Sequence, residues 1–202
     1  MSSELDFLIK EYELCFEQLR FYDNRQENLL KYLFTLTTSV ATAQFAIYKL
    51  IHTIDSRFFI FQTFLSVIVF IASTLLFLSM LQNRLYFVYI ARQINAIRDF
   101  FLSHDSAEFK SNQLYTSTSF PALKLFSVHT FQMLGAAMLC GLYAGSFSYG
   151  LISLSQLIDY RNTCSIIVFI IVSLLFTIGG SIYLFINGRK KADEAIHGEK
   201  IA

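Results

Sequence analysis

The chain has 202 residues, of which 54% are hydrophobic and only 15% are charged. A soluble domain carries about 25% charged residues, so this composition excludes a protein with an ordinary water-exposed surface. The formal net charge of +1 gives no support to nucleic acid as a direct partner, and three scattered cysteines without a CxxC pair exclude a disulfide framework.

The segment 1–28 carries seven acidic residues against three basic ones. Its apolar side chains recur at alternating spacings of three and four, which predicts an amphipathic helix on the cytoplasmic side. Because anionic lipid attracts basic helices rather than acidic ones, we expect this helix to contact protein. The apolar stripe consists of Leu5, Leu8, Tyr12, Cys15, Leu19 and Tyr22.

The chain then contains four stretches of about 20 mostly apolar residues, the length that a helix needs to cross a bilayer. We predict membrane spans at about 29–52, 58–82, 126–152 and 164–187. A helix of a soluble protein is rarely apolar on all sides over this length. The predicted fold is therefore an all-α integral membrane four-helix bundle, with a transmembrane domain over residues 29–187.

Lysine and arginine residues favour the cytoplasmic side of a membrane. They gather before the first span, between the second and third spans, and after the fourth span. The opposite side has Arg57, Arg161 and Lys49. Both termini, the helical linker 83–121 and the tail 188–202 are therefore expected in the cytoplasm. The protein is expected in the cell membrane, which is the inner membrane in a bacterium.

The linker has an apolar stripe and positive charge of its own. The stripe consists of Phe87, Ile90, Ile94, Ile97 and Phe101, next to Arg84, Arg92 and Arg98. This basic helix can pack against the acidic segment 1–28, within one subunit or between subunits. The predicted docking surface for a cytoplasmic protein partner consists of Leu5, Leu8, Tyr12, Leu19, Arg92 and Arg98. After a polar segment at 103–119, Ser119 and Pro121 predict a helix start with proline in the first turn.

Polar residues concentrate in the middle of the first predicted span, in the stretch TLTTSVATAQ at 35–44. On a helix they form one broad sector, which consists of Thr35, Thr37, Thr38, Ser39, Thr42 and Gln44. One interpretation is helix packing, because small residues let backbones approach and hydroxyls bond neighbouring carbonyls. The other is a water-lined surface around an axis shared by several copies. Since an unpartnered Gln44 amide is costly in hydrocarbon, we expect an assembly that places another helix or water beside it.

Small residues in the third and fourth predicted spans favour close helix contacts. Ala137, Gly141 and Gly145 lie four residues apart, and Gly180 lies on a small face of the fourth span. Such spacing forms a groove for a neighbouring helix. His129, near the cytoplasmic end of the third span, is a satisfied polar group, a pH-sensitive gate or a hydrogen-bond partner of Gln132 on a neighbouring copy. The predicted spans contain no Asp or Glu, which argues against a proton-coupled or cation-coupled transporter.

One short string has the spacing of a catalytic motif. RDFFLSH, from Arg98 to His104, resembles the R-x4-6-H motif of HEPN ribonucleases, in which Arg and His from two copies cleave RNA. The resemblance implies an RNA-cleaving effector as a minor alternative, although the soluble helical domain of that family is missing. The other interpretation is an amphipathic helix that ends in a polar loop. Elsewhere no phosphate loop, metal-ligand cluster or Ser-His-Asp arrangement occurs, so neither an enzyme nor a cofactor or metal is predicted.

The order and size of the segments are similar to those of small four-span bacterial membrane effectors that accompany anti-phage defence systems. In that group, oligomers permeabilise or depolarise the inner membrane when a partner signals. The resemblance implies a homo-oligomeric pore-forming or membrane-perturbing effector with a cytoplasmic partner. The alternative hypothesis is a membrane scaffold or sensor that docks such a partner without conducting.

Overall fold

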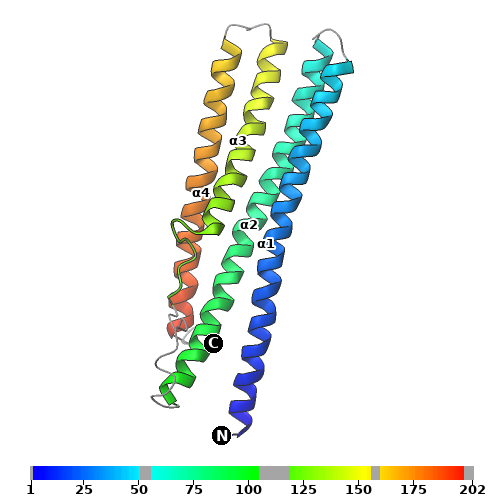
Figure 1. Cartoon of the computed structure of the whole chain (residues 1–202). Coiled ribbons are helices and arrows are strands. Elements are labelled where there is room, and N and C mark those ends of the chain that lie inside the picture. The colour runs from blue at the N-terminus through cyan, green and yellow to red at the C-terminus, as the bar shows by residue number, and fades with distance from the viewer. Residues whose placement is uncertain (1, 51–55, 105–118, 156–159, 198–202) are drawn as a thin grey trace. The chain divides into compact units, whose positions relative to one another are not determined.

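The computed structural model describes residues 2–50, 56–104, 119–155 and 160–197. Most of these residues lie in α-helices and none lies in a strand, which confirms the predicted all-α fold. Most of the predicted polar segment 103–119 lies outside the described residues. The helices shown in Figure 1 are α1 (Ser2–Leu50), α2 (Ser56–His104), α3 (Val128–Leu154) and α4 (Arg161–His197).

Helices α1 and α2 are each 49 residues long, because no helix-breaking residue interrupts them. The first glycine of the chain is Gly135 and its single proline is Pro121, and these are the two residue types that cost most inside a helix. The segment 1–28 and the first predicted span are therefore parts of one helix. In the same way, the linker helix continues from the second predicted span without a break.

Three helices are long and apolar enough to cross a membrane. They are Ser56–Leu102, Val128–Leu154 and Arg161–Arg189. Among the described residues α1 does not reach the same hydropathy, because the polar stretch 35–44 interrupts its apolar part. The second, third and fourth predicted spans thus have apolar helices of sufficient length, and the first predicted span stays a prediction.

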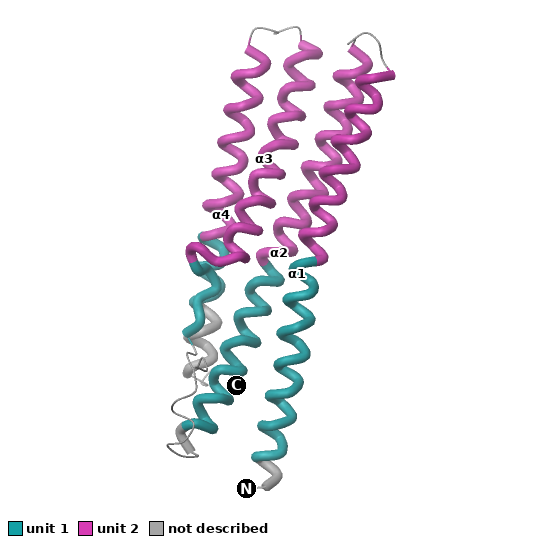
Figure 2. Tube along the Cα trace, viewed as in Figure 1, with its two compact units in different colours: residues 1–27, 82–124, 182–202 teal, residues 28–81, 125–181 magenta. Residues whose placement is uncertain are grey.

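The chain divides into two compact units, coloured teal and magenta in Figure 2. Unit 1 comprises residues 1–27, 82–124 and 182–202, and unit 2 comprises residues 28–81 and 125–181. Three of the helices contribute to both units, while α3 belongs to unit 2. Each unit has its own set of contacts, and the two sets differ in chemistry.

In unit 2, segments of α1, α2 and α3 meet around a small apolar core. Val40, Val69 and Tyr143 are buried there. Half-buried apolar side chains surround them, namely Leu36, Leu65 and Phe70. Ring contacts extend the packing to α4, where Phe176 lies 5.2 Å from Phe77, measured between ring centroids.

The outer surface of unit 2 is strongly apolar on α4. Large exposed side chains cover one broad face of this helix, including Ile167, Ile170, Ile171, Leu174, Leu175 and Ile178, and its other side chains in unit 2 are mostly apolar as well. A helix that is apolar around most of its circumference suits a hydrocarbon environment and does not suit water. This surface is consistent with a membrane protein.

In unit 1, the apolar stripe of α1 packs against α2. Cys15 of α1 and Ile94 and Ile97 of α2 are buried, and the rings of Tyr22 and Tyr86 stack at 5.6 Å. The sequence left open whether the acidic and basic helices pack within one subunit or between subunits. The contacts of unit 1 show that they pack within one chain.

The predicted helix start at Ser119 and Pro121 is wrong. Residues 120–124 form no helix, and α3 begins at Val128 with Ser127 as its N-cap, whose hydroxyl accepts a hydrogen bond from the Thr130 amide at 3.3 Å. Phe126, just before the cap, has a φ of 61°, a left-handed conformation that a continuing α-helix cannot contain. A side-chain cap therefore fixes the start of α3, and the proline does not.

Candidate functional site

The predicted polar sector of α1 divides into an inner and an outer face. Thr37 and Gln44 are half-buried in unit 2, on the side of the buried Val40. The outer face consists of exposed side chains, Thr35, Thr38, Ser39 and Thr42. Sequence spacing placed all six in one sector, whereas contacts with α3 separate them into two faces.

On the inner face, the polar groups of α1 contact the helix bundle. The Tyr143 hydroxyl of α3 donates a hydrogen bond to the Thr37 carbonyl at 3.4 Å, and the Thr37 hydroxyl donates to the Leu33 carbonyl at 2.8 Å. The Gln44 Nε2 atom is buried and has no hydrogen-bond partner among the described residues. Leaving such a donor unsatisfied costs about 1–3 kcal/mol.

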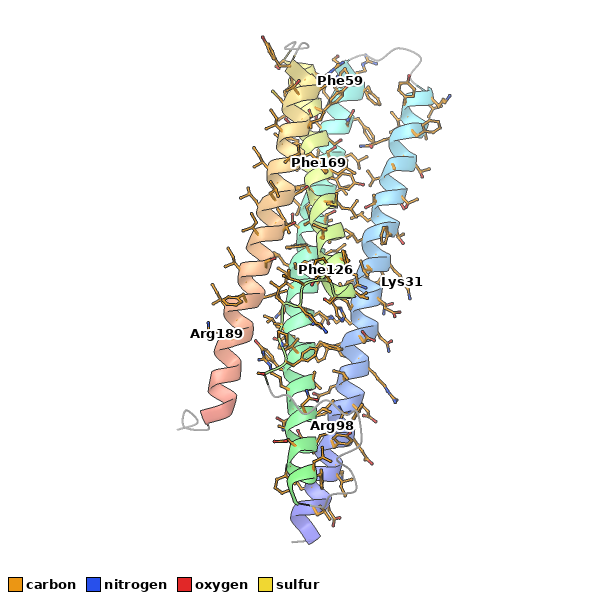
Figure 3. The ribbon with its side chains drawn as sticks, turned by 60° about the vertical axis from the view of Figure 1, so that its left-hand side comes forward. Lys31, Phe59, Arg98, Phe126, Phe169 and Arg189 are labelled. Atoms are coloured by element: carbon orange, nitrogen blue, oxygen red, sulfur yellow. The ribbon has the colours of Figure 1, made fainter. Side chains whose placement is uncertain are left out.

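On the outer face, the threonines lie on a stripe with a lysine at each end. The Thr42 hydroxyl donates to the Thr38 carbonyl at 2.8 Å, so the hydroxyl is bonded within its own helix. Lys31, labelled in Figure 3, and Lys49 are both exposed. They lie about five helical turns and roughly 27 Å apart along the axis, close to the hydrocarbon thickness of about 30 Å. Lys31 also has an interaction partner within the chain.

The predicted small residues of α3 lie where another helix comes closest. A Cβ atom on Gly141 would come within 2.6 Å of the Phe169 carbonyl oxygen, and one on Gly145 within 2.8 Å of the Ser165 carbonyl oxygen. Ala137, one turn earlier, is fully buried. The backbones of α3 and α4 therefore approach closely, as membrane helices with small residues do.

The predicted small residue of α4 contacts α2. A Cβ atom on Gly180 would come within 2.9 Å of the Phe77 ring and 3.3 Å of a Leu81 methyl group. The Phe77 side chain can move, whereas the backbone atoms of α4 that face Gly141 and Gly145 cannot. Gly180 therefore tolerates an added methyl group better than Gly141 or Gly145 does.

A polar cluster between α2 and α3 was missed by the sequence analysis. The Ser66 hydroxyl donates to the Ser146 hydroxyl oxygen at 2.9 Å, and Gln62 Nε2 donates to the same oxygen at 3.3 Å. One turn further, the Thr63 side chain faces Gly150. The signal was present, because polar and small residues recur four apart on otherwise apolar stretches of α2 and α3.

In unit 1, two arginines of α2 hold backbone carbonyls of the connector before α3. Arg84 is only 6% exposed, and its Nε donates to the Ala122 carbonyl at 3.1 Å. Arg92 donates from Nε to the Phe120 carbonyl at 2.9 Å and from Nη1 to the Gly188 carbonyl at 2.8 Å. From the sequence, Arg84 was expected only to contribute to the positive charge of the linker, and Arg92 was expected to dock a partner. Arg92 has internal partners in this structure.

The buried amide side chain of Asn83 links α2 to α1 within unit 1. Asn83 Nδ2 donates to the Tyr22 carbonyl at 2.8 Å and to Gln26 Oε1 at 3.0 Å. Arg98 Nε donates to the Tyr12 hydroxyl at 3.1 Å, and its guanidinium carbon lies 5.6 Å from the centre of the Phe16 ring. Both sets of bonds join α1 to α2.

The remaining predicted docking and gating residues are distributed over several environments. In the docking surface, Leu5 is exposed, whereas Leu8, Tyr12 and Leu19 are half-buried. His129, the second residue of α3, is half-buried and has an interaction partner within the chain. The outward part of the docking surface is therefore smaller than its sequence pattern indicated.

The string that resembles a ribonuclease motif lies at the end of α2. Its Arg98, labelled in Figure 3, contacts the rings of Tyr12 and Phe16 of α1. The side chain of His104 is not among those that the structure describes. Within the described parts of the chain, no group of three or more His, Cys, Asp or Glu side chains could hold a metal ion.

Comparison with protein-family models, with curated proteins and with solved structures gave no match for this chain. Any functional conclusion therefore depends on the geometry of its own residues. Two surfaces stand out on that basis, which are the outer polar face of α1 in unit 2 and the exposed apolar side chains of α1 in unit 1.

Proposed function

We propose that this protein assembles into homo-oligomers in a membrane and acts as a pore-forming effector. In the assembly, the outer face of α1 lines a water-filled passage. The observation that carries the proposal is the exposed row of Thr35, Thr38, Ser39 and Thr42 on a helix of an otherwise apolar bundle. Membrane pores use rings of polar and charged groups to replace the water molecules that hydrate a solute.

The contrast between α1 and α4 supports this arrangement. The exposed surface of α4 in unit 2 is dominated by isoleucine and leucine, which suits contact with acyl chains. The exposed surface of α1 in unit 2 alternates threonine and serine with aromatic side chains. In the proposed assembly α4 faces lipid and α1 faces the common axis, so that both surfaces meet a matching environment.

The charges at the ends of the stripe favour anions. Lys31 and Lys49 lie on the outer face, and residues 28–50 contain no Asp or Glu. Repetition around an axis would produce rings of ammonium groups, which select anions in pores. Lys49 is the better test position, because its ammonium group lies 5.5 Å from the centre of the Phe45 ring, which carries no charge.

A matched pair of threonines tests the pore. The hydroxyls of Thr37 and Thr42 each donate to the carbonyl four residues earlier at 2.8 Å, so Thr→Val removes the same bond in both. Thr42 is exposed and Thr37 is half-buried. Ion flux through liposomes that contain the full chain should fall several-fold for Thr42→Val and stay unchanged for Thr37→Val.

Additional measurements complete this test. Thr38→Leu should also alter the flux without loss of assembly, and Lys49→Glu should shift the reversal potential toward cations. Wild-type protein that causes no leak at any protein density, or that stays monomeric in mass measurements in detergent and in lipid, would contradict the pore. Equal flux for both threonine variants would show that the stripe serves packing.

A second candidate function, a scaffold or sensor for a cytoplasmic partner, is favoured by a different surface. In unit 1, α1 exposes large apolar side chains, Leu5, Phe7, Ile9, Leu14 and Phe21. Exposed apolar side chains at this density suit a protein contact. Since the acidic residues of segment 1–28 lie among them, the fitting partner has a basic rim around an apolar surface.

The scaffold is tested at Phe7 and Phe21, which are 65% and 59% exposed. Changing Arg92 or Arg98 would be ambiguous, because both hold contacts inside unit 1. Phe7→Ser with Phe21→Ser should abolish co-purification of the specific partner and leave the liposome flux intact. Retained co-purification would exclude this surface as the docking site.

A further inference from the structure

A groove of about 410 Å³ opens in unit 2 among α2, α3 and α4. Small-molecule sites occupy about 300–1,000 Å³, so the groove is large enough for a ligand. Its walls are mainly apolar, with Leu142, Ile166 and Phe169 contributing side chains. Figure 3 labels Phe169, which comes from α4. This groove is separate from the outer face of α1.

The polar groups of the groove lie toward one end of it. Helices α3 and α4 run in opposite directions, so residues late in α3 meet residues early in α4. The Arg161 guanidinium carbon lies 4.8 Å from the centre of the Tyr149 ring, and the Ser165 carbonyl faces Gly145. From that end inward, Arg161 faces Tyr149, Ser165 faces Gly145, and Phe169 faces Gly145 and Gly141.

Arg161 does not line the groove itself, but it contacts the lining residue Tyr149 and so places a cation just outside the polar end. It is the first residue of α4, half-buried, and its Nε has no hydrogen-bond partner among the described residues. Its described contact is the Tyr149 ring, which provides no negative charge. A guanidinium presents a planar fork of donors that matches a phosphate. Charge complementarity therefore points to an anionic group.

Ser146 supplies a donor one level further in. Its hydroxyl oxygen accepts hydrogen bonds from Ser66 and from Gln62, which leaves its own proton without an acceptor among the described residues. A ligand with a carbonyl oxygen at this depth would accept that hydrogen bond. Below it the wall is formed by Leu142 and Phe169, which offer contact to a hydrocarbon chain.

We propose that this groove binds one glycerophospholipid of the surrounding bilayer. Its phosphate binds Arg161, one ester carbonyl accepts the Ser146 hydroxyl, and one acyl chain lies along Leu142, Ile166 and Phe169. The order of a phospholipid, from anion through ester to alkane, is the order of the groups along the groove. The site needs the membrane location of α2, α3 and α4 and is independent of conduction along α1.

Native mass spectrometry of the full chain in detergent tests this site, with dioleoyl phosphatidylglycerol and dioleoylglycerol as probes. The two probes have the same oleoyl chains and ester groups, and only phosphatidylglycerol carries a phosphate. Wild type should bind one phosphatidylglycerol per chain in a saturable manner and bind dioleoylglycerol at least about tenfold more weakly, which corresponds to the loss of one strong interaction.

Two variants and their controls separate the site from general lipid contact. Arg161→Gln should weaken phosphatidylglycerol binding about tenfold, with Lys49→Gln as a control cation in the same unit that lies outside the groove. Leu142→Trp should fill the groove and abolish binding of both probes. Leu134→Trp is its control, because Leu134 is also an exposed residue of α3 but does not line the groove.

The outcomes are distinct. Loss of binding in the two groove variants, with both controls and the helical content unchanged, supports the site. Binding that rises with lipid concentration without saturating, or that is equal in wild type and Arg161→Gln, identifies annular lipid and overturns the proposal. Equal binding of both probes excludes the phosphate contact. A failed pore test leaves each of these results interpretable, because none involves ion flux.

Discussion

Units 1 and 2 hold their helices together by opposite means. In unit 1, long polar side chains reach across to backbone carbonyls, as Arg92 does to Phe120 and Gly188. In unit 2, glycines let the helix backbones approach closely. At Gly141, for example, the Phe169 carbonyl would lie only 2.6 Å from an added Cβ. The same two helices, α2 and α4, take part in both kinds of contact.

In the proposed membrane location, the difference follows from what each environment allows. A charged side chain in hydrocarbon is expensive, and lipid offers no hydrophobic driving force between helices, so small residues and close backbones remain. Where water is near, arginine can hold two carbonyls and still be solvated at low cost. Along α2 the change occurs between Ser73, a buried serine of unit 2, and Asn83 and Arg84 of unit 1.

The largest expected effect comes from adding one methyl group in unit 2. Gly141→Ala would force a Cβ against the Phe169 carbonyl and the Ser173 side chain, and overpacking of this kind costs about 1–3 kcal/mol. Gly135→Ala is the matched control on the same helix, because nothing lies within 4 Å of its Cβ position. That control should gain up to about 1 kcal/mol from helix propensity.

Reversible unfolding in mixed micelles measures both glycine variants. A lower free energy of unfolding for Gly141→Ala and an equal or higher one for Gly135→Ala are expected. If both variants unfold alike, close approach of α3 and α4 is not what stabilises unit 2.

In unit 1, the corresponding change is Arg92→Leu. It removes the charged donor of the Phe120 and Gly188 carbonyls, and a hydrogen bond to a charged group contributes about 1.5–3 kcal/mol. We expect about 2 kcal/mol in the free energy of unfolding, at the middle of that range. Arg92→Lys should recover less than half, because an ammonium group lacks the fork that holds two carbonyls at once.

Hydrogen exchange of residues 119–124 and 182–189 locates this effect. Faster exchange there, with unchanged exchange in residues 161–181, is the expected pattern. Uniform acceleration over both units would contradict the comparison, since it would mean that the two sets of contacts are not separable.

The sequence predicted the helices well and their contacts poorly. Apolar length predicted α2, α3 and α4, and the spacing of three and four predicted the buried side of α1 in unit 1. The buried roles of Arg84 and Asn83 were not predictable, because arginine and asparagine are usually exposed and their partners are backbone carbonyls far away in the chain. The sequence predicted the polar stretch of α1. It did not predict that Thr37 lies on the inner face and Thr42 on the outer face, because this division depends on where Tyr143 of α3 lies.

The smallest expected effect concerns Cys15 of unit 1, which is 2% exposed. Burial raises the pKa of this thiol, and the nearby Glu11 carboxylate, 3.8 Å from its Sγ, raises the pKa further. A raised pKa means less thiolate at pH 8, so Cys15 should react slowly with maleimide.

Glu11→Gln removes the second cause of the raised pKa. This change shifts the profile of rate against pH to lower pH and increases the rate at pH 8 by less than about tenfold. Glu13→Gln, an exposed acid on the other side of α1, should leave the profile unchanged. Site-resolved mass spectrometry measures the rate, and identical profiles for Glu11→Gln and wild type would show that local opening, and not ionisation, limits access to unit 1.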